Sequence, residues 1–335
     1  MPPTVRPKLL VIAGVLVTPL VTAATALAGN GGFAPVAPES PNAHAIKQSY
    51  LFISLFAFAI FLLVEGLLIA FVIRYRRRKR PREADGAQIH GANKLELAWT
   101  VGPVLILAVI ATFVFVKLPT IQDVPASAAT SQNLVVDVIG TQFTWQFRYP
   151  NGVVTIDRMR APEGRTVELH ITAPDWDVIH SWWIPALGGK IQAIPGRINH
   201  TWFQADPGSY EGQCAELCGV FHASMGATVQ AGTQQQYDHY LATWHETIGK
   251  QIWNGVCATC HGNLGQGGYG IAIANNSLLT QKSGLEGILR HGFTGSRGSM
   301  PPVGNTWTQD EIDALAAYVK KHIYKSAPTG ATSGG

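Results

Sequence analysis

The stretch QCAELCGVFHASM, residues 213–225, decides how the rest of the chain is interpreted. Cys214 and Cys218 stand four residues apart, His222 follows four residues later, and Met225 comes three residues after it. A disulfide between the two cysteines would be sterically tight and would leave the histidine and methionine unexplained. Zinc suits two thiolates and two imidazoles, but a thioether is a poor zinc ligand. Soft sulfur ligands favour copper or iron–sulfur chemistry instead.

Ligand counting narrows the choice of metal. A single-copper electron-transfer site uses two histidines, one cysteine and a weak methionine, but here a second cysteine is present. If the distant His180 joins, two thiolates bridging two coppers use every member of the set. Each metal then receives two sulfurs and one imidazole, and Met225 binds weakly to one of them. The stretch predicts a dinuclear copper site, and a purely structural site is the alternative.

Composition points to a membrane protein. Of the 335 residues 47% are hydrophobic and only 14% are charged, which is low for a soluble protein. The net charge of +4 includes a short basic run. Its members are Arg74, Arg76, Arg77, Arg78, Lys79, Arg80 and Arg82. Nucleic acid is not an expected partner, because a long apolar segment ends immediately before this run.

The N-terminal third predicts a leader and two membrane spans. Early positive charges, an apolar stretch and the small-residue signal Ala26-Leu27-Ala28 predict a cleaved signal peptide at 1–28, a retained membrane helix being the alternative. An extracytoplasmic segment, 29–45, would follow. A transmembrane hairpin is expected over 46–119, with spans at about 50–73 and 97–118, long enough for the roughly 30 Å hydrocarbon core. The basic loop at 74–94 would be cytoplasmic, which places everything after Pro119 outside.

The next segment has a β pattern. LVVDVIG, FTWQFRY, TVELHIT and ATVQAG alternate apolar and polar residues and are separated by Pro- and Gly-containing turns. This pattern predicts an antiparallel β-sandwich or barrel over 120–232. A connecting helix is expected at 233–246.

The C-terminal part carries a second redox motif. VCATCHG, residues 256–262, is a C-x-x-C-H signal for covalent haem c attachment, with Cys257 and Cys260 as thioether positions and His261 as an iron ligand. A thioredoxin-type C-x-x-C is the alternative. Met300 is the expected sixth ligand, because His/Met ligation raises the haem potential. His291 is the rival ligand and fits better as a cap of a helix C-terminus.

The haem motif belongs to a domain expected over 247–325. Its closing helix, TWTQDEIDALAAYVKKHI, has Thr308 as N-cap and Glu311 completing a capping box. The tail, 326–335, is disordered by its composition.

DVIHSWWIPALGGKIQAIPGR (177–197) and GQCAELCGVFHASM (212–225) together resemble subunit II of haem–copper cytochrome c oxidases, over about residues 45–230. The resemblance implies a cupredoxin-like Greek-key barrel that holds the dinuclear copper centre CuA. The implied copper ligands are His180, Cys214, the carbonyl of Glu216, Cys218, His222 and Met225. The Glu216 carboxylate would also reach a magnesium or manganese ion shared with subunit I.

Further positions follow from the same resemblance. LELAWT (95–100) is similar to the family stretch at the mouth of a proton path, which makes Glu96 the candidate proton-uptake carboxylate, a simple interfacial charge being the alternative. Phe143 stands where the family commonly has the tryptophan that accepts electrons, and Trp145 matches a later tryptophan. Gln192 stands where an aspartate is common, so an acidic docking patch for a diffusing cytochrome c is not expected. Glu65, inside the first span, has no implied role.

Residues 247–325 resemble class I cytochrome c. The expected fold class is thus a multidomain membrane protein with a two-helix transmembrane hairpin, an all-β cupredoxin-like Greek-key barrel and an all-α cytochrome c domain. The implied function is subunit II of an aa3/caa3-type oxidase in a bacterial cytoplasmic membrane. Expected partners are subunit I with its haem a and haem a3–CuB site, subunit III, membrane lipid, and a donor such as cytochrome c or a quinol–cytochrome c reductase. The alternatives are the electron-input subunit of a CuA-containing nitric oxide reductase and a membrane-anchored copper chaperone.

Overall fold

The computed structural model describes residues 36–76, 88, 90–125, 133–296 and 298–325. The expected signal peptide, residues 29–35 of the segment after it, most of the basic loop and the C-terminal tail lie outside these residues. The chain divides into two compact units, one formed by residues 44–123 and the other by the residues on either side.

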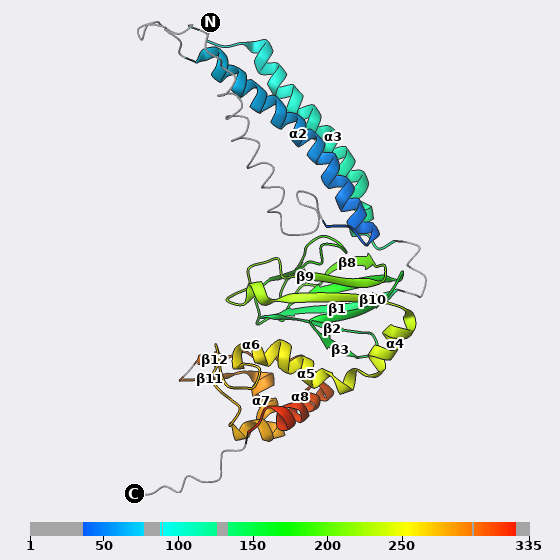
Figure 1. Ribbon diagram of the computed structural model, residues 1–335, viewed down its shortest axis with the longest axis vertical. Coiled ribbons are helices and arrows are strands. Elements are labelled where there is room, and N and C mark those ends of the chain that lie inside the picture. The colour runs from blue at the N-terminus through cyan, green and yellow to red at the C-terminus, as the bar shows by residue number, and fades with distance from the viewer. Residues whose placement is uncertain (1–35, 77–87, 89, 126–132, 297, 326–335) are drawn as a thin grey trace, which may run out of the picture. The chain divides into compact units, whose positions relative to one another are not determined.

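The first unit is a pair of long apolar helices that run side by side, α2 (Pro41–Tyr75) and α3 (Asn93–Gln122) (Figure 1). The rings of Phe52 and Phe113 stack with their centroids 4.0 Å apart. Lys117 Nζ donates to Gln48 Oε1 at 2.8 Å. By length and composition both helices can cross a membrane, and each extends beyond its predicted span at both ends.

The second unit contains a β domain of two main sheets. The larger sheet has the strand order β3-β2-β1-β5-β8 and the smaller one β4-β10-β9. The strands are β1 (Leu134–Thr141), β2 (Thr144–Arg148), β3 (Val154–Ile156), β4 (Arg158–Pro162), β5 (Thr166–Thr172), β6 (His180–Trp182), β7 (Ile191–Ala193), β8 (Asn199–Gln204), β9 (Gly208–Gln213) and β10 (Gly226–Gly232). Alternate residues of β1 and β5 are buried, as their alternating sequences predict.

The predicted antiparallel pairing is wrong for two pairs of strands. β1 pairs with β5 in parallel, and β10 pairs with β4 in parallel. The other pairs in the two main sheets are antiparallel. The alternation of apolar and polar residues reports which face of a strand is buried and carries no information on the direction of its neighbour.

The C-terminal region is mainly helical. Its elements are α4 (Gln234–Ala242), η3 (Trp244–Glu246), α5 (Ile248–Ile252), the π-helical turn η4 (Trp253–Cys257), α6 (Ala258–His261), η5 (Ser277–Thr280), α7 (Lys282–His291), β11 (Phe293–Gly295), β12 (Gly298–Met300) and α8 (Gln309–His322). The capping box predicted for Thr308 and Glu311 is confirmed. The hairpin of β11 and β12 is a small departure from an all-α domain.

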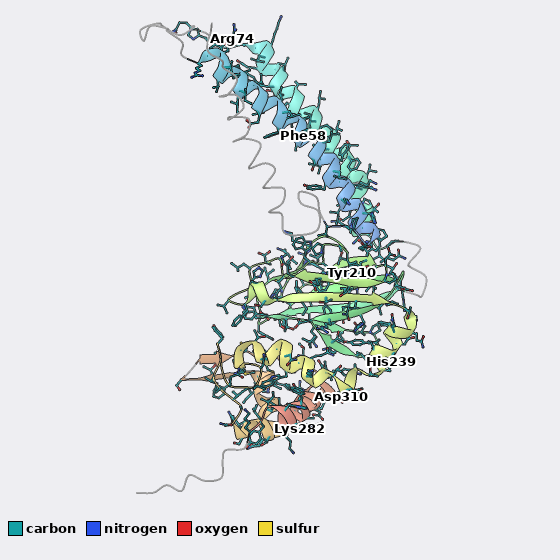
Figure 2. All side chains as sticks on the ribbon, in the orientation of Figure 1. Phe58, Arg74, Tyr210, His239, Lys282 and Asp310 are labelled. Carbon is teal, nitrogen blue, oxygen red and sulfur yellow. The ribbon has the colours of Figure 1, made fainter. Side chains whose placement is uncertain are left out.

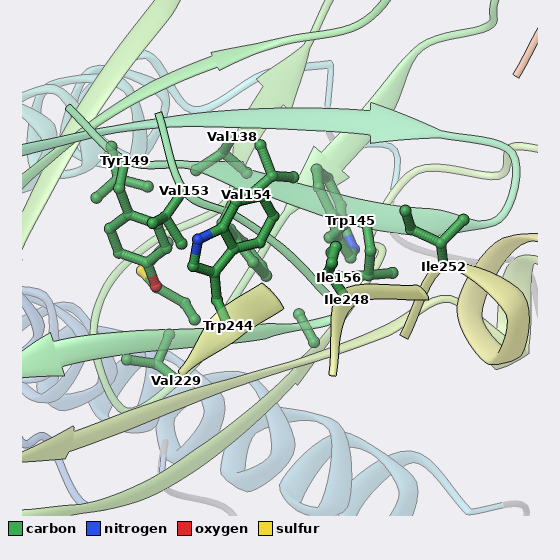
Figure 3. Packing of buried hydrophobic residues seen from close by; sticks show 14 of the residues in the cluster. Val138, Trp145, Tyr149, Val153, Val154, Ile156, Val229, Trp244, Ile248 and Ile252 are labelled. Carbon is green, nitrogen blue, oxygen red and sulfur yellow. The ribbon is translucent and has the colours of Figure 1, made fainter. Parts of the chain in front are cut away.

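The helical region packs on the outward face of the β2–β3 edge. Ile156 belongs to one continuous buried cluster with Ile248 and Ile252 of α5 (Figure 3). Polar contacts cross the same boundary: Gln146 Nε2 donates to Glu311 Oε1 at 3.1 Å, and the amide of Ile156 donates to Gln251 Oε1 at 3.2 Å. The two domains therefore share a core.

Candidate functional site

The fold brings the sulfur and imidazole groups of the candidate copper site together. His180 begins β6, and Cys214 follows β9 directly. Their Sγ and Nδ1 atoms lie 4.0 Å apart, and Cys214 Sγ lies 3.9 Å from Cys218 Sγ. Cys218 Sγ lies 3.6 Å from His222 Nδ1 and 3.8 Å from the sulfur of Met225. Each thiol thus has one imidazole beside it, and the five side chains proposed as copper ligands lie together in one cluster.

Glu216 presents its carbonyl to the same cluster. The Sγ of Cys214 lies 3.3 Å from this oxygen. The Glu216 carboxylate faces the other way and accepts from Gln192 Nε2 at 3.3 Å. The donor set therefore fits two soft cations: two sulfurs lie between two imidazoles, with a thioether and a carbonyl at the ends. The predicted magnesium or manganese contact of Glu216 stays a prediction.

The two thiols differ in acidity. Burial works to raise the pKa of both, because a thiolate loses hydration. For Cys214 burial is the largest single effect, but the hydrogen bonds to the His180 ring and to the backbone of Ser181 and Glu216 together outweigh it and lower the pKa. For Cys218 burial, reinforced by the neighbouring Cys214, raises the pKa to about 12. Without a metal, the pair of cysteines therefore favours one thiolate and one thiol. Bound copper would supply the positive charge that stabilises both as thiolates.

Asp177 is a residue of this site that the motif search missed. Its side chain, like that of His180, is 0% exposed, and Oδ1 lies 3.5 Å from His180 Nε2. The backbone amide of Gln142 donates to Asp177 Oδ2 at 2.9 Å. The two ring nitrogens of His180 therefore face a thiol and a carboxylate, an arrangement that orients metal-binding histidines. The only sequence signal was an aspartate three residues before the histidine.

Aromatic rings surround the cluster. Trp145 is fully buried and meets the His180 ring edge-on, with the centroids 6.1 Å apart. Phe143 lies edge-on to Phe221, 5.3 Å between centroids, and Phe221 lies edge-on to Tyr269 at 5.5 Å. Phe221 belongs to the copper-site stretch, and Tyr269 follows the C-x-x-C-H motif. No motif in the sequence indicates this contact.

The haem motif lies where η4 passes into α6. Cys257 ends η4, and Cys260 and His261 lie in α6. His261 Nδ1 is 2.8 Å from the carbonyl oxygen of Ile271. Donation to that oxygen leaves Nε2 free for iron, so these residues fit a covalently bound haem. The Ile271 carbonyl is therefore the partner of the second ring nitrogen of His261.

The two candidates for the sixth ligand lie in different elements. Met300 ends β12 and packs against the core cluster. His291 is the last residue of α7, the position expected for a side chain at a helix C-terminus. Met300 remains the predicted ligand.

Glu96 lies in the first turn of α3 and accepts the backbone N–H of Ala92 at 3.0 Å. This contact satisfies one of the free amides of the helix start. Glu65 is exposed on α2. Proton uptake by Glu96 stays a prediction.

Comparison with known proteins identifies the family. A cytochrome c oxidase subunit 2 from Alkalihalophilus pseudofirmus is 30% identical over 319 residues, covering 88% of this chain and 92% of the relative. The chain belongs to the cytochrome c oxidase subunit II family. The subunit II transmembrane domain matches residues 30–116, and the subunit II periplasmic domain matches 153–232. Residues 246–319 match cytochrome c oxidase, cbb3-type, subunit III.

The chain is also similar to a second curated relative and to part of a solved structure. Cytochrome c oxidase subunit 2 from Synechocystis is 33% identical over 256 residues, which cover 64% of this chain and 76% of the relative. The crystal structure of the periplasmic domain of oxidase subunit II from Bradyrhizobium japonicum is 30% identical. The match covers 35% of this chain and 96% of that one, with a TM-score of 0.33. The predicted family and fold class, a membrane-anchored subunit II with a fused cytochrome c domain, are confirmed.

Proposed function

We propose that this subunit II is the electron-input subunit of a caa3-type haem–copper oxidase. The observation that carries the proposal is the pair of donor sets in one compact unit: the cluster around Cys214 and Cys218, and the C-x-x-C-H motif with His261. When bound, CuA and haem c supply one-electron redox chemistry. Electrons from an external donor would pass through haem c and CuA to haem a of subunit I. There dioxygen is reduced to water, coupled to proton translocation.

The residues of this chain hold and shield the two groups. Cys214, Cys218 and Met225 are at most 3% exposed, so the copper cluster is largely closed to water. Asp177 orients His180, and the Ile271 carbonyl orients His261. Fixed ligands and low solvent access keep reorganisation small when an electron arrives or leaves.

The partner side of the proposal follows from the family. Subunit I, with haem a and the haem a3–CuB site, would receive electrons, and subunit III and lipid would surround the helices. Glu216 would share a magnesium or manganese ion with subunit I, and Glu96 would lie at the mouth of a proton path. The fused haem domain makes docking of a diffusing cytochrome at Phe143 unnecessary, since Phe221 and Tyr269 link that position to the haem loop.

The test is to purify the detergent-solubilised complex and to record optical and EPR spectra with metal analysis. We expect two coppers in a mixed-valence centre and one haem c on this subunit, with haems a in its partner. Zinc in place of copper, or a partner that holds only haem b, would contradict the proposal.

Assays of nitric oxide reduction and of copper release by the same purified complex separate the alternatives. A CuA-containing nitric oxide reductase would combine this subunit with a partner that has no use for Glu96 and would reduce nitric oxide. A copper chaperone would release copper reversibly and would need neither Met300 nor the haem motif. A ubiquinol oxidase is disfavoured, because that branch of the family lacks the copper ligands.

A further inference from the structure

A second group of metal-binding side chains lies on the outward face of the larger sheet. His170 of β5 is paired in register with His200 of β8 and with Asp137 of β1. Glu168 precedes His170 by two residues and points to the same face, because side chains alternate along a strand. The helical domain packs on the β2–β3 edge, whereas these four residues keep 25–56% of their side-chain surface exposed. None of them belongs to the copper cluster.

Three of the side chains converge on one point. Glu168 Oε1 lies 3.3 Å from His170 Nε2 and 3.6 Å from His200 Nδ1. One ligand atom from each of the three residues lies within 4.8 Å of the other two. The two imidazole rings stand edge to face, 4.6 Å between centroids. Neighbouring strands thus aim two nitrogens and one carboxylate oxygen into a common space.

These separations match a tetrahedral ion. Zinc binds nitrogen and carboxylate oxygen at about 2.0–2.2 Å, so two of its ligands stand roughly 3.3–3.6 Å apart. The two carboxylate-to-imidazole distances fall at the limits of that interval. Two histidines and one glutamate, with water at the fourth position, are an established zinc donor set.

Asp137 supplies an outer contact. Its Oδ1 lies 3.5 Å from Nδ1 of His170, the nitrogen that does not face Glu168. A carboxylate on the far nitrogen of a histidine fixes the ring's tautomer and makes the other nitrogen a better ligand. The two carboxylates would also neutralise a divalent cation between neutral imidazoles. The alternative is an ion pair between a carboxylate and a protonated imidazole. A protonated ring nitrogen cannot bind a metal ion, so the two uses of the ring exclude each other.

We propose that Glu168, His170 and His200 form a surface site for a zinc-class divalent ion, with Asp137 orienting His170. The site is separate from the copper centre in position and in chemistry, since it offers nitrogen and oxygen instead of sulfur. Mg²⁺ should not occupy it, because magnesium prefers oxygen ligands in octahedral geometry.

The experiment is a Zn²⁺ titration of the tag-free full chain in detergent, loaded with copper and haem beforehand. We expect one additional Zn²⁺ per chain, with the CuA absorption unchanged. Zinc X-ray absorption should show two imidazole nitrogens and at least one oxygen. H170A, H200A and E168Q should each weaken Zn²⁺ binding by at least about tenfold, and D137N by about ten- to a hundredfold.

The matched control is H239A, which removes a histidine of α4 that lies outside the group (Figure 2). Its Zn²⁺ affinity should equal that of the wild type. Unchanged CuA spectra and thermal midpoints without zinc will show that the variants fold. Binding that survives in the H170A/H200A double variant, that falls equally in H239A, or that Mg²⁺ displaces would overturn the proposal.

Discussion

Asp177 stabilises the one copper-set histidine that comes from outside the stretch 213–225. The side chains of His180 and Asp177 are fully buried. Water therefore cannot take the place of the Asp177 carboxylate beside the His180 ring. The carboxylate also accepts from the amide of Gln142, which ties the His180 ring to the loop before β2. A single buried carboxylate therefore positions a ligand with one oxygen and connects it to the scaffold with the other.

Asp177→Asn should weaken copper retention without preventing folding. The amide keeps the size of the side chain but removes the negative charge beside His180 Nε2, and loss of such outer partners costs about ten- to a hundredfold in metal affinity. The measurement is copper content after competition with a chelator. Asp175→Asn, at an exposed neighbouring position, is the control. Equal copper retention in both variants would show that Asp177 does not position the ligand.

The turn between β3 and β4 carries a buried carboxylate where it meets the helical region. Asp157 Oδ1 accepts from Thr144 Oγ1 and from the amide of Trp145, both at 2.8 Å. Asp157 has a φ of 57°, in the left-handed region that asparagine and aspartate tolerate best. A Cβ on Gly255 of η4 would lie 2.8 Å from Asp157 Oδ2, so glycine is required for this close approach.

Burial makes Asp157 a source of pH dependence. Loss of hydration raises its pKa from 3.8 to about 6, against hydrogen bonds from Trp145 and Thr144 that lower it. Because the folded state binds the proton more tightly than the unfolded state, this group's contribution to stability is full below about pH 4 and is lost as pH rises through about 6. The loss is on the order of 2–3 kcal/mol.

Asp157→Asn should remove the contribution of this carboxyl group to the pH dependence of the unfolding free energy. Asparagine keeps the oxygen acceptor and tolerates the left-handed backbone. The unfolding free energy of the variant minus that of the wild type should therefore increase as the pH rises from 4 to 7. Chemical denaturation at a series of pH values measures it. Asp310→Asn, which removes an exposed carboxylate at the start of α8, is the control, and its difference should lack the rise expected for Asp157→Asn. A flat difference for Asp157→Asn would contradict the raised pKa.

Local signals in the sequence predicted some elements well. The capping box at Thr308 depends on two residues three positions apart, and the set of Cys214, Cys218 and His222 depends on residues four positions apart. The parallel pairing of β1 with β5 could not be predicted, because it depends on which strands become neighbours. Asp177 was missed because one aspartate near a histidine is not a distinctive pattern until the fold buries both.

The aromatic contact between the two redox regions belongs to the same class of features. Phe221 and Tyr269 come from different domains, which pack together through the shared core around Ile156 and Ile248. Tyr269 is 71% exposed, so its ring adds little to the core and its main contact is with Phe221. The two domains therefore meet both through a buried interface and through this exposed ring pair.

Tyr269→Ala should slow electron transfer from haem c to CuA while leaving both spectra intact. Edge-to-face ring pairs contribute about 0.5–1.5 kcal/mol, so the equilibrium between loops in contact and loops apart should shift by roughly two- to tenfold. The rate of electron transfer should fall by a similar factor. Flash-induced reduction of haem c in the purified complex, followed at the CuA absorption, measures the rate. Tyr269→Phe retains the ring and should transfer at the wild-type rate. An unchanged rate in Tyr269→Ala would mean that electrons cross the domain boundary elsewhere.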